Sequence, residues 1–196
     1  EDLKYATNTS GTWVVTTVDS CESVGEYSSI ALGASDYVHI SYYDLYNKAL
    51  KYATNASGSW VASTVDSNGE VGKYTSISQD GSGNAHISYY DFIGGNLKYA
   101  RWTGSAWNIE VVDSLGDVGY FTSLALDGAG NPHIGYHTLD YRDLKYARWT
   151  GSEWLTQITR WARAQLTRSV HHSSRRRSPC APMSGSPRMW YTRTGT

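Results

Sequence analysis

Short runs of apolar and β-branched residues alternate with clusters of Gly, Asn, Asp and Ser along most of this chain. In one representative stretch the runs lie at 74–79, 85–90, 97–102 and 107–113. Runs of this length that are bounded by turn residues are typical of β-strands. No segment before residue 155 combines helical length with apolar residues at helical spacing. The pattern therefore predicts an all-β protein of short strands.

The same pattern returns every 47 residues. The leucine of a Leu-Lys-Tyr-Ala motif recurs at Leu3, Leu50, Leu97 and Leu144, and a tryptophan recurs at Trp13, Trp60, Trp107 and Trp154. A fixed period of this length indicates one supersecondary unit copied in space, and four antiparallel strands in about 40–45 residues make a β-propeller blade. We therefore expect a β-propeller of four-stranded antiparallel blades.

The first and last strands of the unit differ in how strictly the copies agree. In the first strand a large residue (Ile30, Ile77 or Leu124) is flanked by small Ser and Ala residues. Because successive strand residues face opposite sides of a sheet, one face is bulky and the other small, as blades stacked face to face require. The last strand is more variable, with Glu110 at a position where the two earlier copies have Thr16 and Ser63, which is typical of a solvated rim.

The consensus Y-T-S-I/L-A-L-D-x-x-G-x-P/A-H-I-S-Y-Y-D…L-K-Y-A…G-S-x-W…V-D-S resembles the blade repeat of secreted microbial β-propellers. These are broadly similar to lectin-type and sialidase-like propellers, and the resemblance covers residues 1 to about 158. It implies the propeller fold and an extracellular, secreted protein. It implies no particular activity, because propellers host many unrelated functions.

The repeat boundaries predict complete blades at about 27–66, 74–113 and 121–160, with residues 3–19 supplying only the outer half of another blade. One interpretation is a closed ring of four blades, the last of which is shared between the two chain ends. Shared closure would bury strand edges that otherwise template aggregation. The alternative is an arc of a larger ring that is completed by other chains or by sequence missing here.

The segment 159–196 departs from the repeat. All 18 acidic residues precede residue 154, whereas this segment holds 8 Arg and no acid, with Arg160 where the repeat has aspartate. One hypothesis is a reading-frame slip, after which the segment could still complete the last blade. The alternative is a basic arm, but an Arg cluster without interleaved aromatic residues is weak evidence for nucleic-acid binding. We expect no nucleic-acid partner, and the chain has no apolar run of membrane-spanning length.

Little in the repeat predicts catalysis or a cofactor. His39, His86 and His133 recur at one position, and we expect structural histidines there because a metal site needs convergent ligands. Asp44 and Asp91 follow a strand as turn formers do. The Asp-Gly-x-Gly-Asn segments at 80–84 and 127–131 lack the alternating acids of calcium loops and indicate hairpin turns. The triple arginine that a sialidase resemblance would require is missing, so we expect no enzyme and no cofactor.

Aromatic residues are the best candidates for ligand binding. Trp102 and Trp149 occupy a position that is Asn in the earlier copies, so the fold does not require tryptophan there. In the Tyr-Tyr pairs, we expect one ring to pack and its neighbour, Tyr43 or Tyr90, to lie nearer a groove. Aromatic faces stack on sugars, and Asp44, Asp91 and the three histidines could bond hydroxyls. The sequence thus predicts a lectin-like module that binds glycans in grooves between blades; the alternative is a structural protein that self-assembles into a ring or filament.

Overall fold

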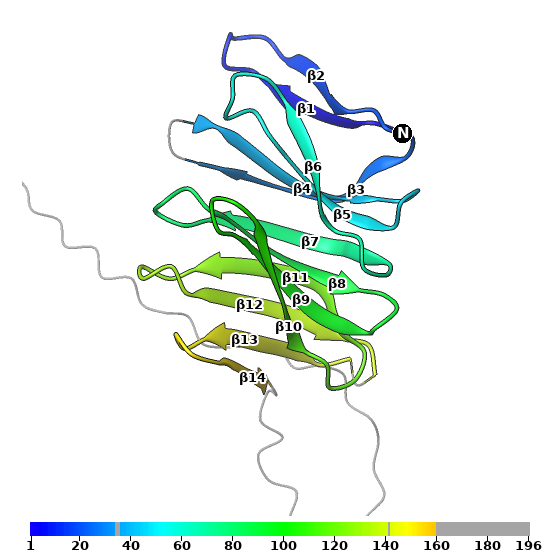
Figure 1. Ribbon diagram of the computed structural model, residues 1–196, viewed down its shortest axis with the longest axis vertical. Coiled ribbons are helices and arrows are strands. Elements are labelled where there is room, and N and C mark those ends of the chain that lie inside the picture. The colour runs from blue at the N-terminus through cyan, green and yellow to red at the C-terminus, as the bar shows by residue number, and fades with distance from the viewer. Residues whose placement is uncertain (34–35, 141, 160–196) are drawn as a thin grey trace, which may run out of the picture. The chain divides into compact units, whose positions relative to one another are not determined.

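The computed structural model describes residues 1–33, 36–140 and 142–159, and in these residues the chain is all β (Figure 1). Residues 160–196 of the basic segment lie outside the described residues, and with them the predicted frame slip and completion of the last blade. None of the described residues forms a helix with the length and apolarity that crossing a membrane would need.

The described strands form one two-stranded and three four-stranded antiparallel sheets, numbered here in chain order. Sheet 1 consists of β1 (Leu3–Thr7) and β2 (Val14–Asp19). Sheet 2 consists of β3 (Val24–Leu32), β4 (Val38–Asp44), β5 (Ala49–Thr54) and β6 (Val61–Asp66). Sheet 3 consists of β7 (Val71–Gln79), β8 (Ala85–Asp91), β9 (Asn96–Trp102) and β10 (Trp107–Asp113). Sheet 4 consists of β11 (Val118–Leu126), β12 (Pro132–Thr138), β13 (Leu144–Trp149) and β14 (Trp154–Ile158).

Each four-stranded sheet is a meander in which every strand pairs with the next one along the chain. Three such sheets in succession fit a propeller-like architecture. Within the described residues the sheets do not close into a ring.

The first strand of each repeat begins three residues earlier than the sequence pattern predicts. In sheet 3, β7 begins at Val71, and its pairing with β8 shifts register between Lys73 and Ser76. Tyr74, in that interval, has a φ of 54°, and Tyr27 and Phe121 repeat this conformation. A bulge inserts an extra residue and interrupts the alternation of facing side chains. The apolar pattern therefore does not continue across it.

A glycine before each bulge packs closely against the invariant leucine of the Leu-Lys-Tyr-Ala motif in the preceding sheet. Gly72 has a φ of 107°, and a Cβ added there would lie 2.7 Å from the Cα of Leu50 in the preceding sheet. Gly25 and Gly119 approach Leu3 and Leu97 in the same way. Only glycine combines this conformation with so close an approach of two backbones.

The predicted small face of the first strand makes hydrogen bonds between sheets. The Ile77 N–H donates to the Ser29 hydroxyl at 3.2 Å, and the Leu124 N–H donates to the Ser76 hydroxyl at 3.0 Å. Ile77 and Leu124 are buried, whereas Ile30, in the first strand of sheet 2, is 55% exposed. The face of β7 and β11 is thus covered by the preceding sheet.

A buried Asp–Tyr–Lys group, here called the latch, joins each sheet to the next. The Asp66 carboxylate at the end of sheet 2 accepts hydrogen bonds from the Tyr89 hydroxyl at 2.7 Å and the Lys98 ammonium at 2.5 Å, both in sheet 3. The other two latches are Asp19–Tyr42–Lys51 and Asp113–Tyr136–Lys145. Every polar group of the latch has a partner, so this ionic contact can be buried between apolar sheets.

Candidate functional site: the groove between sheets 3 and 4

A groove of about 650 Å³ lies between sheets 3 and 4. Sheet 3 supplies the loop after β7 and polar side chains from β8, β9 and β10. Sheet 4 supplies the loop between β11 and β12 and two tryptophans, one from β13 and one from β14. Because consecutive strand residues face opposite sides, the groove receives alternate residues of β9, Tyr99 and Arg101, and of β10, Asn108 and Glu110.

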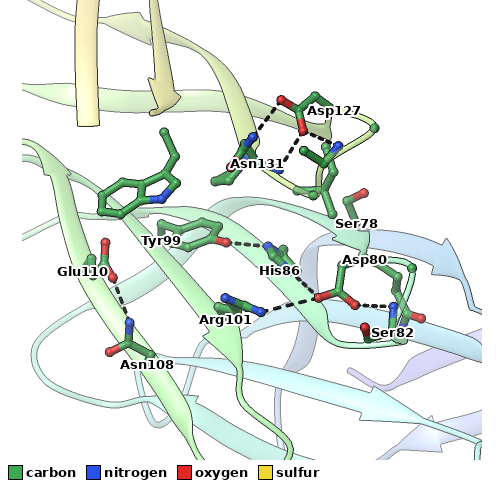
Figure 2. Close-up of a pocket in the computed structure, with 18 of the residues that line it drawn as sticks. Ser78, Asp80, Ser82, His86, Tyr99, Arg101, Asn108, Glu110, Asp127 and Asn131 are labelled. Atoms are coloured by element: carbon green, nitrogen blue, oxygen red, sulfur yellow. Dashed lines mark hydrogen bonds and ion pairs between the residues drawn. The ribbon is translucent and has the colours of Figure 1, made fainter. Parts of the chain in front are cut away.

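A line of hydrogen-bonded polar side chains forms the sheet 3 wall. Figure 2 shows His86 between Tyr99 and Asp80. The His86 Nε2 lies 3.4 Å from Asp80 Oδ2, and its Nδ1 pairs with the Tyr99 hydroxyl. A neutral imidazole that donates from Nε2 to Asp80 can accept the Tyr99 hydroxyl proton at Nδ1, so both contacts are satisfied by one tautomer. The Arg101 Nη2 lies 3.7 Å from the same Asp80 oxygen.

The loop of Asp80 fixes its carboxylate. Asp80 accepts hydrogen bonds from the backbone N–H groups of Ser82 and Asn84 and from the Asn84 side chain, all at 2.9 Å. Burial by itself would raise the pKa of Asp80, but these bonds and that of His86 lower it to about 2. Burial lowers the pKa of His86, which favours its neutral form. The turn assignment for residues 80–84 is confirmed by these bonds.

Two tryptophans form the sheet 4 wall. The rings of Trp149 and Trp154 have centroids 5.6 Å apart, and Trp154 packs edge-on against Tyr99 of sheet 3 at 5.1 Å. The Trp154 indole N–H donates to Glu110 Oε2 at 2.8 Å. This bond joins β14 to β10 and fixes a carboxylate and an indole beside each other.

The equivalent interface between sheets 2 and 3 lacks these charged groups. One repeat earlier, Gly33, Thr54 and Ser63 stand where sheet 3 has Asp80, Arg101 and Glu110. A Cβ added at Gly33 would lie 2.5 Å from Gln79 Oε1, so the Gln79 side chain occupies the space beside it. The polar chemistry of the groove is therefore not a property of every repeat.

Two of the residues predicted from the sequence, Trp149 and His86, line this groove. Trp102 is outside its lining. Trp102 packs against Trp107 with ring centroids 5.4 Å apart, as Trp149 does against Trp154, but it also packs against the core shared by sheets 2 and 3. The two repeat-equivalent tryptophans thus differ in setting, although the sequence treats them alike.

Four other predicted residues have roles away from the groove. Tyr43, Tyr90 and Asp44 are at most 1% exposed, so the expectation that the second tyrosine of each pair opens toward a groove does not hold. Tyr90 donates to Asp117 at 2.5 Å, and Asp44 accepts from the Asn47 N–H at 2.9 Å. Asp91 accepts from the Gly94 N–H at 2.9 Å. Both aspartates therefore hold turns.

The histidines pair with tyrosines of their own sheets. His39 pairs with the Tyr52 hydroxyl, and His133 pairs with the Tyr146 hydroxyl at 2.5 Å. Each partner lies on the neighbouring strand of the same sheet, so these contacts are internal to one sheet. Among the residues that the structure describes, no group of three or more His, Cys, Asp or Glu side chains is placed to hold a metal ion.

Sequence reasoning missed Arg101 and Glu110 as groove residues. The sequence pattern at Glu110 indicated a variable position at a solvated rim, and arginines were considered only for the triple set that a sialidase would need. The sequence did hold a clue to these residues. Arg101 and Glu110 are charged, whereas the preceding copy has the uncharged Thr54 and Ser63 at the same positions. Positions that are the same in every copy are expected to maintain the shared fold. Positions that change between copies can give one interface a site that the others lack.

Comparison with known proteins gives structural likeness only. No family model matches the chain, and the search of curated proteins finds no match. A fucose lectin from Kordia zhangzhouensis, solved with methyl-fucoside, is 22% identical with a TM-score of 0.45, over 66% of this chain and 96% of the lectin. A polysaccharide lyase of family PL25, an ulvan lyase, is 12% identical with a TM-score of 0.52. That match covers 72% of this chain and 45% of the lyase, so the chain spans less than half of the enzyme. The likeness to the lyase supports the propeller-like fold.

Proposed function

We propose that this protein is a secreted, non-catalytic carbohydrate-binding module that holds a glycan in the groove between sheets 3 and 4. The observation that carries the proposal is the pairing of an indole wall, Trp149 and Trp154, with a wall of fixed polar groups. The apolar face of a sugar ring stacks on an indole, while its hydroxyls need donors and acceptors at set positions. A volume of about 650 Å³ is in the range of small-ligand sites, roughly 300–1,000 Å³.

The protonation states in the groove favour binding over hydrolysis. A glycosidase needs one carboxylic acid that stays protonated near neutral pH and a second carboxylate across the scissile bond. Hydrogen bonds from Asn131 lower the pKa of Asp127 to about 2, and the pKa of Asp80 is lowered to about 2 as well. Both side chains are therefore carboxylates at neutral pH and serve as hydrogen-bond acceptors.

The test compares two tryptophans that the repeat makes equivalent. We would screen the intact protein on a glycan array and measure the best ligand by calorimetry with Trp149→Ala and, as the matched control, Trp102→Ala. Loss of a stacking indole should weaken binding about 10–100-fold. The control should bind as the unchanged protein does, and urea unfolding would check that both variants fold.

A second substitution separates a local role from a folding defect. Arg101 has a half-exposed side chain, and Arg101→Thr installs the residue that sheet 2 has at Thr54. We expect weaker binding with unchanged stability. If Trp149→Ala and Arg101→Thr both bind every array ligand normally, the groove is not the glycan site.

Self-association is a second candidate because the two ends of the sheet series have complementary features. Trp60, Trp107 and Trp154 each pack on a tyrosine of the preceding sheet, whereas Trp13 is 71% exposed. At the other end Leu144 is 57% exposed, although its equivalents Leu50 and Leu97 are buried. Light scattering across a range of concentrations tests this. A mass that grows with concentration supports assembly, and a constant monomer mass of 21.7 kDa excludes it.

A further inference from the structure

The charges that line the groove are unbalanced. Asp80, Glu110 and Asp127 contribute carboxylates, whereas Arg101 contributes the one guanidinium of the lining. His86 adds no positive charge at neutral pH, since burial lowers its pKa. The groove as a whole is therefore negative.

The positive charge of Arg101 is directed to Asp80. Its Nη2 lies 3.7 Å from Asp80 Oδ2, which also faces His86. Among the described residues, no Lys or Arg lies within ion-pair distance of Glu110 or Asp127. The His133 Nε2, however, lies 3.5 Å from Asp127 Oδ2, so among the described residues Glu110 is the groove carboxylate without a basic side chain within ion-pair distance.

Hydrogen-bond donors hold the carboxylates of Glu110 and Asp127 in place. Glu110 accepts hydrogen bonds from the Asn108 side chain and from the Trp154 indole, each at 2.8 Å. Asp127 accepts from the N–H groups of Ala129 and Asn131. The two donors of Glu110 position its carboxylate without neutralising it, and since each Glu110 oxygen accepts one of them, each keeps a lone pair for a ligand.

We infer that the groove selects a glycan with a free amino group, a hexosamine, and excludes glycans that carry uronate or sulfate. This rests on the proposed function. An ammonium beside Glu110 gains a charge-assisted hydrogen bond, and over the neighbouring Trp149 or Trp154 face it gains a cation–π contact. An anionic sugar would meet like charge in a groove that is partly closed to water, where charges are poorly screened.

The repeat shows which residue carries this selectivity. Glu110 replaces Thr16 and Ser63 of the earlier copies, so no copy requires a carboxylate there for folding. Glu110→Gln removes the charge and keeps an amide oxygen that can accept the Trp154 N–H. A change in selectivity in this variant would therefore report charge and not the loss of the indole contact.

The experiment uses three tetrasaccharides on the intact protein at pH 6: β-1,4-linked glucosamine, the same oligomer fully N-acetylated, and an oligogalacturonate. At this slightly acidic pH the primary amines of the glucosamine oligomer are mostly protonated. We expect the glucosamine oligomer to bind about 10-fold or more tightly than its acetylated form, and the galacturonate not to bind. Glu110→Gln should bring the ratio of the first two affinities close to one.

The outcomes separate this inference from the proposed function. Equal or tighter binding of the acetylated oligomer or of the galacturonate overturns the inference, while loss of that binding in Trp149→Ala still supports a glycan site. Failure of all three oligomers to bind also overturns it, and the array then decides the proposed function alone. Amine selectivity that survives Glu110→Gln unchanged overturns the role of Glu110.

Discussion

The latch between sheets 2 and 3 predicts a large cost for one charge-removing substitution. Asp66 and Lys98 are buried, with side chains 4% and 9% exposed, and the Asp66 carboxylate also accepts the Tyr89 hydroxyl at 2.7 Å. Asp66→Asn would leave the Lys98 ammonium buried without a counter-charge. Breaking such a pair costs about 3–5 kcal/mol. With a urea m-value of about 2 kcal/mol/M, the unfolding midpoint should fall by roughly 1.5–2.5 M.

Two controls test the reasoning behind that magnitude. Asp66→Asn combined with Lys98→Met removes both charges and should recover most of the lost stability, since an apolar replacement of a buried pair is often neutral. Asp2→Asn removes an exposed ion pair with Lys4, whose side chain is 51% exposed, and should cost about 0–1 kcal/mol. The reasoning is refuted if Asp66→Asn costs under about 1 kcal/mol or if the double variant is no more stable than the single one.

The same latch has a pH dependence of known sign. Burial by itself would raise the pKa of Asp66, but hydrogen bonds from Lys98, the Asn68 N–H and Tyr89 lower it below the ordinary value of 3.8. A carboxyl whose pKa is lowered by folding contributes stability above its unfolded pKa and loses it as pH falls through the folded pKa. The difference in urea midpoint between the unchanged protein and Asp66→Asn should therefore be constant above about pH 5 and shrink below pH 3.8.

Three further predictions concern the repeat. Gly72→Ala should cost about 1–3 kcal/mol in urea unfolding, because φ is 107° and the added Cβ meets backbone, whereas Gly81→Ala, with open space around it, should be nearly neutral. Trp107→Ala should lower the free energy of unfolding by about 2–4 kcal/mol because the Trp107 ring packs between sheets. Trp13 is 71% exposed, so Trp13→Ala should change the free energy of unfolding by at most about 0.5 kcal/mol. Equal losses in the two variants would contradict this packing. Burial lowers the pKa of His86 in the folded protein, so the unfolded state binds the proton at a higher pH than the folded state does. The protein should therefore lose stability as pH falls below about 6.5. In thermal melts, His86→Gln should make this loss smaller.

The residues of the groove were harder to predict than the strands for a physical reason. Residues that every copy needs, such as Leu50 over Gly72 or the latch lysine Lys98, recur because each sheet meets the next in the same way. Tyr43 and Tyr90 share that regularity, and the structure buries both. Strict recurrence therefore did not separate packing residues from groove residues such as His86, and the irregular positions Arg101 and Glu110 supply charges that the earlier copies lack.

The sequence by itself determined the all-β class, the four-strand unit and the small face of the first strand, because strand period, turn residues and the 47-residue repeat are local properties of the chain. Only the tertiary structure decided which partner each repeated residue meets. The start of β7 at Val71 depends on a bulge, and the latch joins Asp66 to a lysine 32 residues away in another sheet. Trp102 and Trp149 are identical in sequence context but differ in surroundings, because sheet 3 presents Asp80 and Glu110 to one interface and sheet 2 presents Gly33 and Ser63 to the other. Such differences arise from contacts between sheets, which no single repeat encodes.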